Sequence, residues 1–288
     1  MIWLLISILT NTLLLLILKG FERFGVNTLH GIVVNYIVAA ITGVCVAGIP
    51  AMDVLEVRAG GILWIPVLLG LLFISIFFTL AKTAQVAGIS VATVANKMSV
   101  VIPVVLALYL YDEHLNLIKA IGICAALLAV WMSSRKSAGT SFDPKYLYFP
   151  VIIFIGSGII DALINHLQKT IPGQEMIPFV FSIAFTCAFL VGVAVISYRT
   201  VRFRERISMK SVLGGIVLGI PNYFSIFAVA KALDTHIMDS SAFYPVNNMG
   251  IVVCSAISAR MIFREKLSAI NWMGIALSVG AIAMIAFS

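Results

Sequence analysis

Ten long apolar runs follow one another along this chain of 288 residues, separated by short polar segments. A helix of about 20 residues crosses the hydrocarbon core of a bilayer, and the runs have this length once the sixth continues through Asp161 toward Lys169. Lipid offers no hydrogen-bond partner to an open sheet edge, so spans of this length are helices. The runs lie at 1–18, 31–52, 59–81, 83–111, 115–134, 146–160, 176–198, 211–230, 240–259 and 267–288.

The composition excludes a water-soluble protein. Hydrophobic residues make up 61% of the chain and charged residues only 11%, whereas a soluble domain is about one quarter charged. The remaining segments are too short for a soluble domain, and we expect an integral protein of the lipid bilayer. The net charge of +7 does not indicate a nucleic-acid partner, because the basic residues lie in the segments between spans.

Lysine and arginine are unevenly divided between the two sets of connecting segments. Only four follow even-numbered runs: Arg58, Lys119, Lys169 and Lys231. The positive-inside rule therefore places the segments after odd-numbered runs in the cytoplasm and both termini outside. The basic residues after odd-numbered runs are Lys19, Arg23, Lys82, Arg135, Lys136, Lys145, Arg199, Arg202, Arg204, Arg206, Lys210, Arg260, Arg264 and Lys266.

The two halves of the chain resemble each other. DEHLNLIKAIGICAALLAVWM, from Asp112, matches REKLSAINWMGIALSVGAIAM, from Arg264, at an offset of 152 positions. Two further anchors pair Lys19 with Lys169 and Lys82 with Lys231, at offsets of 150 and 149. Each half then holds five spans, and an odd number forces the second half to enter the membrane from the opposite side. The sequence predicts an all-α polytopic membrane protein with ten transmembrane helices in two five-helix inverted-topology repeats, residues 1–137 and 138–288.

This pattern resembles the EamA-type transporters of the drug/metabolite transporter superfamily. In that family each repeat has a Glu at the mouth of the last helical hairpin and a Gly inside the final helix. The present sequence has Glu113 with Gly122 and Glu265 with Gly274. It departs from the family in placing Asp112 and Arg264 where a small Gly usually precedes the Glu, and Pro103 stands closer to Glu113 than is typical. The resemblance covers nearly the whole chain.

The resemblance implies a secondary transporter that works by alternating access. A small polar or amphipathic metabolite would bind near the midplane, between the two repeats, and we expect it to carry an anionic group. Since the sequence holds no ATP-binding motif, a coupling proton, another ion gradient or a counter-substrate would supply the energy. The expected location is the cytoplasmic (inner) membrane of a bacterium.

Lys97 is the one basic residue well inside an apolar run. It lies in VATVANKMSVVIPVV, from Val91, within roughly 5 Å of the midplane at 1.5 Å per helical residue. Charges at this depth face the bundle interior and usually mark a substrate or ion path. We predict that Lys97 binds substrate together with Asn96. The alternatives are a helix-to-helix tether and a neutral lysine bonded to backbone carbonyls.

Polar residues at related places predict the rest of the site. AFYPVNNMGIVV, from Ala242, is the counterpart in the second half and contributes Tyr244, Asn247 and Asn248. Prolines nearby, Pro245 here and Pro103 after Lys97, would each free a backbone carbonyl one turn earlier.

Two more runs contribute polar residues. Asp161 and Asn165 in the sixth run are four residues apart and share a helix face. Asp161 would either form an ion pair with Lys97 or titrate as a coupling carboxylate. Tyr223 in the eighth run completes the predicted substrate-binding set, and Asn11 matches Asp161 in the first half.

Other functional classes fit the sequence less well. No zinc-protease, serine-hydrolase or phosphate-loop motif occurs, and the four cysteines fall in different runs without metal-site spacing. We therefore expect no enzyme, cofactor or metal. The main alternative is a membrane-embedded enzyme acting on a lipid-linked or small polar substrate, which would need a nucleophile and a base at one leaflet. A membrane scaffold or receptor would not need charges at the midplane.

Overall fold

The computed structural model describes residues 2–47, 64–110, 116–133, 148–170, 177–234 and 240–286. The described residues form helices joined by short turns and contain no strand. The helices are α1 (Ile2–Arg23), α2 (Thr28–Ala47), α4 (Trp64–Val86), α5 (Ile89–Met98), α6 (Val101–Leu110), α7 (Leu117–Ser133), α8 (Tyr148–Thr170), α9 (Ile177–Phe203), α10 (Met209–Asp234), α11 (Ser240–Ile262) and α12 (Ala269–Ala286).

The all-helical architecture and a membrane location agree with the expectation. Among the described residues, six stretches are long and apolar enough to cross a membrane: Ile2–Arg23, Thr28–Val46, Trp64–Val86, Ile89–Leu106, Val180–Phe203 and Met209–Val229. Three shorter helical stretches are also apolar: Leu117–Ser133, Tyr148–Ile164 and Ala269–Ile285. Numerous large apolar side chains lie exposed on these helices, as expected where lipid and not water surrounds the protein.

The fourth apolar run is not one continuous helix. It divides into α5 and α6, with a turn at Ser99–Val100. Pro103 explains the position of this break, because it has no amide proton to donate to the carbonyl of Ser99. The amide of Ile102 donates to that carbonyl instead, over 2.9 Å. The break directly follows Asn96 and Lys97.

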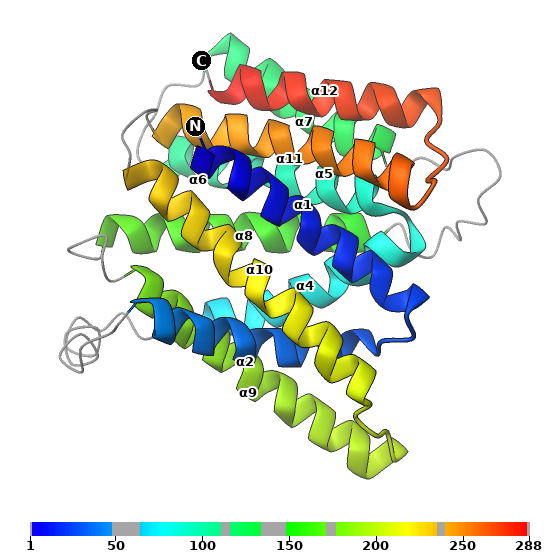
Figure 1. The fold of residues 1–288 in the computed structure, drawn as a ribbon. Coiled ribbons are helices and arrows are strands. Elements are labelled where there is room, and N and C mark those ends of the chain that lie inside the picture. Colours follow the sequence, from blue (N-terminus) through cyan, green and yellow to red (C-terminus); the bar gives the residue numbers. More distant parts are fainter. Residues whose placement is uncertain are drawn as a thin grey trace.

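The helices run alongside one another (Figure 1). The start of α1 and the end of α12 lie at the same end of the bundle, on the left of the view. At the opposite end Lys19 of α1 contacts Glu265, which lies between α11 and α12, and the backbone carbonyl of Gln85 at the end of α4. The segment before α2 contacts the start of α10 there, where the amide of Asn27 donates to Ser211 Oγ over 3.1 Å. We call this second end the Glu265 end.

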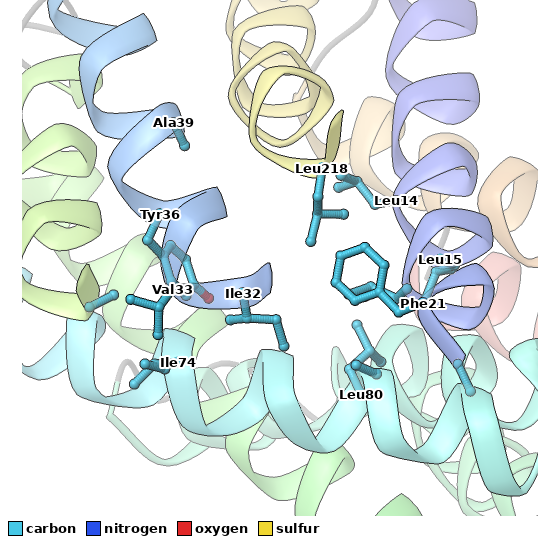
Figure 2. Packing of buried hydrophobic residues seen from close by; sticks show 14 of the residues in the cluster. Leu14, Leu15, Phe21, Ile32, Val33, Tyr36, Ala39, Ile74, Leu80 and Leu218 are labelled. Atoms are coloured by element: carbon cyan, nitrogen blue, oxygen red, sulfur yellow. The ribbon is translucent and has the colours of Figure 1, made fainter. Parts of the chain in front are cut away.

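A large apolar core joins α1, α2, α4, α9 and α10. Figure 2 shows Leu14, Leu15 and Phe21 of α1 near Leu218 of α10, and Tyr36 of α2 above Ile74 of α4. A second core joins α5 and α6 to α7, α11 and α12.

Glycines allow α7 and α12 to approach closely. A Cβ atom at Gly274 of α12 would lie 2.7 Å from the backbone nitrogen of Ser133 in α7, and one at Gly122 of α7 would lie 2.8 Å from Ile285 Cγ1 in α12. Small residues at such contacts are typical of helix pairs in membranes, where close packing replaces the hydrophobic effect. These are the two glycines that the sequence match pairs at an offset of 152 positions. Glu113 lies outside the described residues.

The first prediction concerns this helix pair. Gly274→Ala should lower the free energy of unfolding by about 1–3 kcal/mol, because the added methyl group meets backbone atoms of α7. Gly280→Ala in the same helix is the control, since nothing lies within 4 Å of its Cβ position, and it should be neutral or stabilise by up to about 1 kcal/mol. Reversible unfolding in mixed micelles measures both. Equal effects at the two positions would contradict the close contact.

Candidate functional site

A cluster of polar side chains from α5 and α8 surrounds the break between α5 and α6. Asn96 Nδ2 donates a hydrogen bond to Ser157 Oγ over 2.8 Å, and Ser99 Oγ lies 3.0 Å from Asp161 Oδ2. The Ser99 hydroxyl is also within hydrogen-bond reach of the Asn96 carbonyl. One hydroxyl carries one proton, so it donates either to this carbonyl or to the carboxylate. The helix break and the carboxylate are therefore linked through Ser99.

Lys97 and Asp161, residues of opposite formal charge, lie close enough across this cluster for their charges to interact. Lys97 is half-buried at the end of α5, whereas Asp161 is exposed although it belongs to the middle of α8. The structure thus brings together three of the predicted substrate-binding residues, Asn96, Lys97 and Asp161, and adds Ser99 and Ser157, which the sequence analysis did not select. Serine is common in apolar helices, where it bonds to its own backbone, so no sequence pattern distinguishes these two from the other serines.

The exposed surface of Asp161 does not belong to the lipid-facing side of α8. That side is marked by the exposed side chains of Val151, Ile152, Ile155 and Ile159. At about 100° per residue, Asp161 lies roughly 80° around the helix from Val151 and roughly 120–180° from the three isoleucines. α8 contacts α4, α5 and α6, so the carboxylate points to the side of α8 where these helices lie.

The predicted asparagines of α11 lie on a helix that packs against both α5 and α1. Asn247 is buried, with 4% of its surface exposed, and its Oδ1 atom has no hydrogen-bond partner. Asn248 is half-buried. An unsatisfied amide oxygen in a buried place is costly, and it leaves Asn247 with an acceptor available to a ligand or a water molecule. The side chain of Asn165, one turn beyond Asp161, is outside the described residues.

The two predicted tyrosines belong to other parts of the bundle. Tyr223 is buried between α10 and α2, beside Gly43, and its ring stacks on Phe227 at 6.1 Å. Tyr244 packs with Phe243 in an apolar cluster that includes Leu4 of α1. Aromatic residues are frequent in this chain, so the sequence could not separate core tyrosines from ligand-facing ones.

A second polar contact inside the membrane joins α2 to α10. Asn222 Nδ2 donates to Asn35 Oδ1 over 3.1 Å, and both side chains are buried. Asn35 was not among the predicted site residues, although it is a polar residue inside an apolar run. This contact fixes two helices to each other and lies beside the buried Tyr223.

Charged groups gather at the Glu265 end. Arg199 Nη2 of α9 bonds Glu205 Oε1 over 2.6 Å, and His30 Nε2 of α2 lies 3.8 Å from Glu205 Oε2. Glu265 contacts Lys19 at 3.7 Å. Within the described part of the chain, no group of three or more His, Cys, Asp or Glu residues is placed to hold a metal ion.

Comparisons with known proteins support the fold and leave the activity open. A solved crystal structure of a protein aligns with 97% of this chain and 96% of its own, with a TM-score of 0.58 and 14% identity. A protein of Haemophilus influenzae, described as uncharacterized, is 29% identical over 216 residues, which cover 74% of this chain and 72% of that protein. No family model matches the sequence.

The second prediction concerns the asparagine pair. A double-mutant cycle on Asn35→Ala and Asn222→Ala should give a coupling of about 0.6 kcal/mol and at most about 1.7 kcal/mol, the range of hydrogen bonds between membrane helices. Asn35→Ala combined with Asn11→Ala is the control, because Asn11 bonds to the Ser7 carbonyl of its own helix. Unfolding in mixed micelles measures both cycles. Equal coupling in the two would contradict the contact.

Proposed function

We propose that this protein is a secondary transporter that binds the anionic group of a small polar or amphipathic metabolite at Lys97. The observation that carries the proposal is the opposed pair of Lys97 and Asp161 at the break between α5 and α6. Charged groups at membrane depth are expensive and mark a substrate or ion path in most cases. A broken helix at the same place leaves backbone groups that only a lined, polar space tolerates.

The pair has the chemistry of an exchangeable contact. An ammonium in a low-dielectric place attracts a carboxylate or phosphate strongly, because water screens it weakly. Asp161 neutralises Lys97 while no substrate is bound, and an incoming anion replaces it as the partner of the ammonium. Asn96 and Ser99 then supply hydrogen bonds beside the charge. Asn247 contributes its free amide oxygen if α11 moves toward the site.

The arrangement of helix contacts supports the two-repeat architecture, residues 1–137 and 138–288. If the halves correspond, α1, α2, α4, α5–α6 and α7 are equivalent to α8, α9, α10, α11 and α12. The contact between α2 and α10 then corresponds to the contact between α9 and α4. The contact between α1 and α10 corresponds to the contact between α8 and α4. The contact between α1 and α11 corresponds to the contacts of α8 with α5 and α6. The contact between α5 and α7 corresponds to the contact between α11 and α12. Such a bundle can rock about a central site to give alternating access.

The Lys97–Asp161 pair also offers a way to couple transport to a proton or to a second substrate. If a bound anion pairs with the Lys97 ammonium, Asp161 loses its neutralising partner. Binding of another cation beside the Asp161 carboxylate is then favoured. A proton on Asp161 would satisfy this requirement. A second anion exchanged at Lys97 would serve as well, and either mechanism fits transport driven by a gradient in the inner membrane of a bacterium.

The third prediction concerns Lys97. Lys97→Ala should fold and lose ligand binding, and Lys97→Arg should not restore it, because a planar guanidinium replaces a compact ammonium. Thermal shift of the purified protein against a library of small carboxylates and phosphate esters measures binding, since a ligand of the folded state raises its stability. Lys82→Ala is the control: Lys82 is also half-buried, but its ammonium lies over the Phe78 ring, 5.9 Å from the centroid, away from the cluster.

Two outcomes would overturn this assignment. The first is an unchanged ligand shift in Lys97→Ala. The second is loss of folded protein in Lys97→Ala with recovery in the Lys97→Ala/Asp161→Asn double variant, which would identify a structural tether.

The fourth prediction concerns orientation. In a cysteine-free background, Ser288→Cys should react with an impermeant maleimide in intact cells, and Arg204→Cys should react only after the membrane is opened. The excess of lysine and arginine at the Glu265 end is the reason. The reverse labelling would place the Glu265 end outside the cell without altering the fold.

A further inference from the structure

Glu265 binds the first residue of α5, although the two residues are 176 positions apart in the sequence. Its Oε1 atom accepts a hydrogen bond from the amide of Ile89 over 2.8 Å, and the amide of Ser90 also bonds to the carboxylate. α5 has no capping side chain at its own N-cap position, Gly88. The carboxylate therefore caps α5, where amide groups and the helix dipole favour a negative charge.

The backbone on both sides is shaped for this contact. Gly88 has a φ of 109°, and a Cβ atom there would lie 2.9 Å from Glu265 Oε2, so a side chain at this position would displace the carboxylate. Arg264 has a φ of 53°, a conformation that glycine adopts more readily. Arg264 therefore adopts a glycine-like backbone directly before Glu265. Arg260 Nη1 donates to the Glu265 carbonyl over 3.3 Å.

Lys19 makes the cap part of a larger connection. Its Nζ atom lies 3.7 Å from Glu265 Oε1 and donates to the Gln85 carbonyl over 3.1 Å. Gln85 Nε2 in turn donates to the Leu18 carbonyl over 3.0 Å. One carboxylate thus joins the end of α1, the turn between α4 and α5, and the segment between α11 and α12.

The ionised carboxylate is held at a cost to stability. Burial raises the pKa of Glu265, and the Ile89 amide and the charge of Lys19 oppose this only in part. A carboxyl group with a higher pKa in the folded state stabilises the fold when it is protonated, and that contribution is lost as the pH rises through the raised pKa. The hydrogen bond from Ile89 and the contact with Lys19 therefore hold a carboxylate whose charged form burial disfavours.

We propose that Glu265 is a positioning residue that closes this end of the bundle and holds α5, so that its release opens a path from the Glu265 end to the cluster at Lys97. This inference rests on the proposed transport function. α5 is the element that connects the two places: it begins at the cap and ends at Asn96 and Lys97, about 12 Å away at 1.5 Å per residue. Between them, every residue of Ile89–Ala95 is buried. A short, fully packed helix moves as a unit, so displacement of Lys97 by a substrate strains the cap, and loss of the cap frees the helix.

The fifth prediction tests this closure without substrate. Ala95→Cys, a fully buried position in α5, reports access in a cysteine-free protein reconstituted in vesicles. Glu265→Ala should make this cysteine react roughly tenfold faster with an impermeant maleimide added at the Glu265 end, and leave the rate from the other end unchanged. Glu265→Gln keeps an oxygen that accepts from the Ile89 amide but loses the attraction of Lys19, so it should increase the labelling rate by less. Lys19→Gln should give the same smaller increase, and the double variant Lys19→Gln/Glu265→Gln should label no faster than either single variant.

Melting temperature separates a closing role from a purely structural cap. Glu265→Gln should keep or raise the melting temperature, because it removes a buried charge, while it speeds labelling. Glu22→Gln, an exposed carboxylate of α1 at the same end, is the matched control and should change neither. An unchanged labelling rate in all Glu265 variants would overturn the proposal. Faster labelling from both ends, accompanied by a lower melting temperature, would also overturn it. Because no ligand is used, a failure here is distinct from a failure of ligand binding at Lys97.

Discussion

The interaction between the opposite charges of Lys97 and Asp161 is the feature on which the functional interpretation of this structure depends. Neither charge would be stable alone at this depth, since hydrocarbon does not solvate it. Their attraction therefore ties α5 to α8, and the break at Ser99 places polar groups beside the pair. The energetic cost of this arrangement is the argument for a role beyond folding, because an apolar pair of similar volume would hold the two helices at least as well.

The rest of the bundle has the packing expected around a polar centre. Helices α7 and α12 meet closely through Gly122 and Gly274, and the Asn35–Asn222 hydrogen bond joins α2 to α10. Such contacts give rigid elements, and rigid elements transmit a local change at one site to the ends of a helix. The carboxylate of Asp161 is exposed and turned away from the lipid-facing side of α8, and we propose the centre between these elements as the place for a polar ligand.

Glu265 adds a connection between this centre and one end of the protein. It caps the same half-helix that presents Lys97, and it comes from a segment near the end of the chain. A carboxylate cap that is buried and paired with Lys19 can be released by a modest change in either partner. In the proposed cycle, this is the contact that forms and breaks.

The sequence determined the helical class, the membrane environment and the special status of Lys97, because apolar length and a charge in the middle of an apolar run have few alternative explanations. It also selected Asp161, from polarity inside an apolar run, either as the ion-pair partner of Lys97 or as a coupling carboxylate. The tertiary structure decided which polar residues meet: Asn96, Ser99, Ser157 and Asp161 converge, whereas Tyr223 and Tyr244 pack in apolar surroundings.

The break between α5 and α6 and the cap by Glu265 were likewise decided by tertiary structure. Pro103 marks where a helix loses a hydrogen bond, but a proline inside a helix produces a kink or a break according to what its neighbours supply. Glu265 and Ile89 are far apart in the chain, and no local pattern pairs a carboxylate with a distant helix start. Periodicity and composition are local properties, whereas the contacts that give a buried charge its role join segments that only the fold brings together.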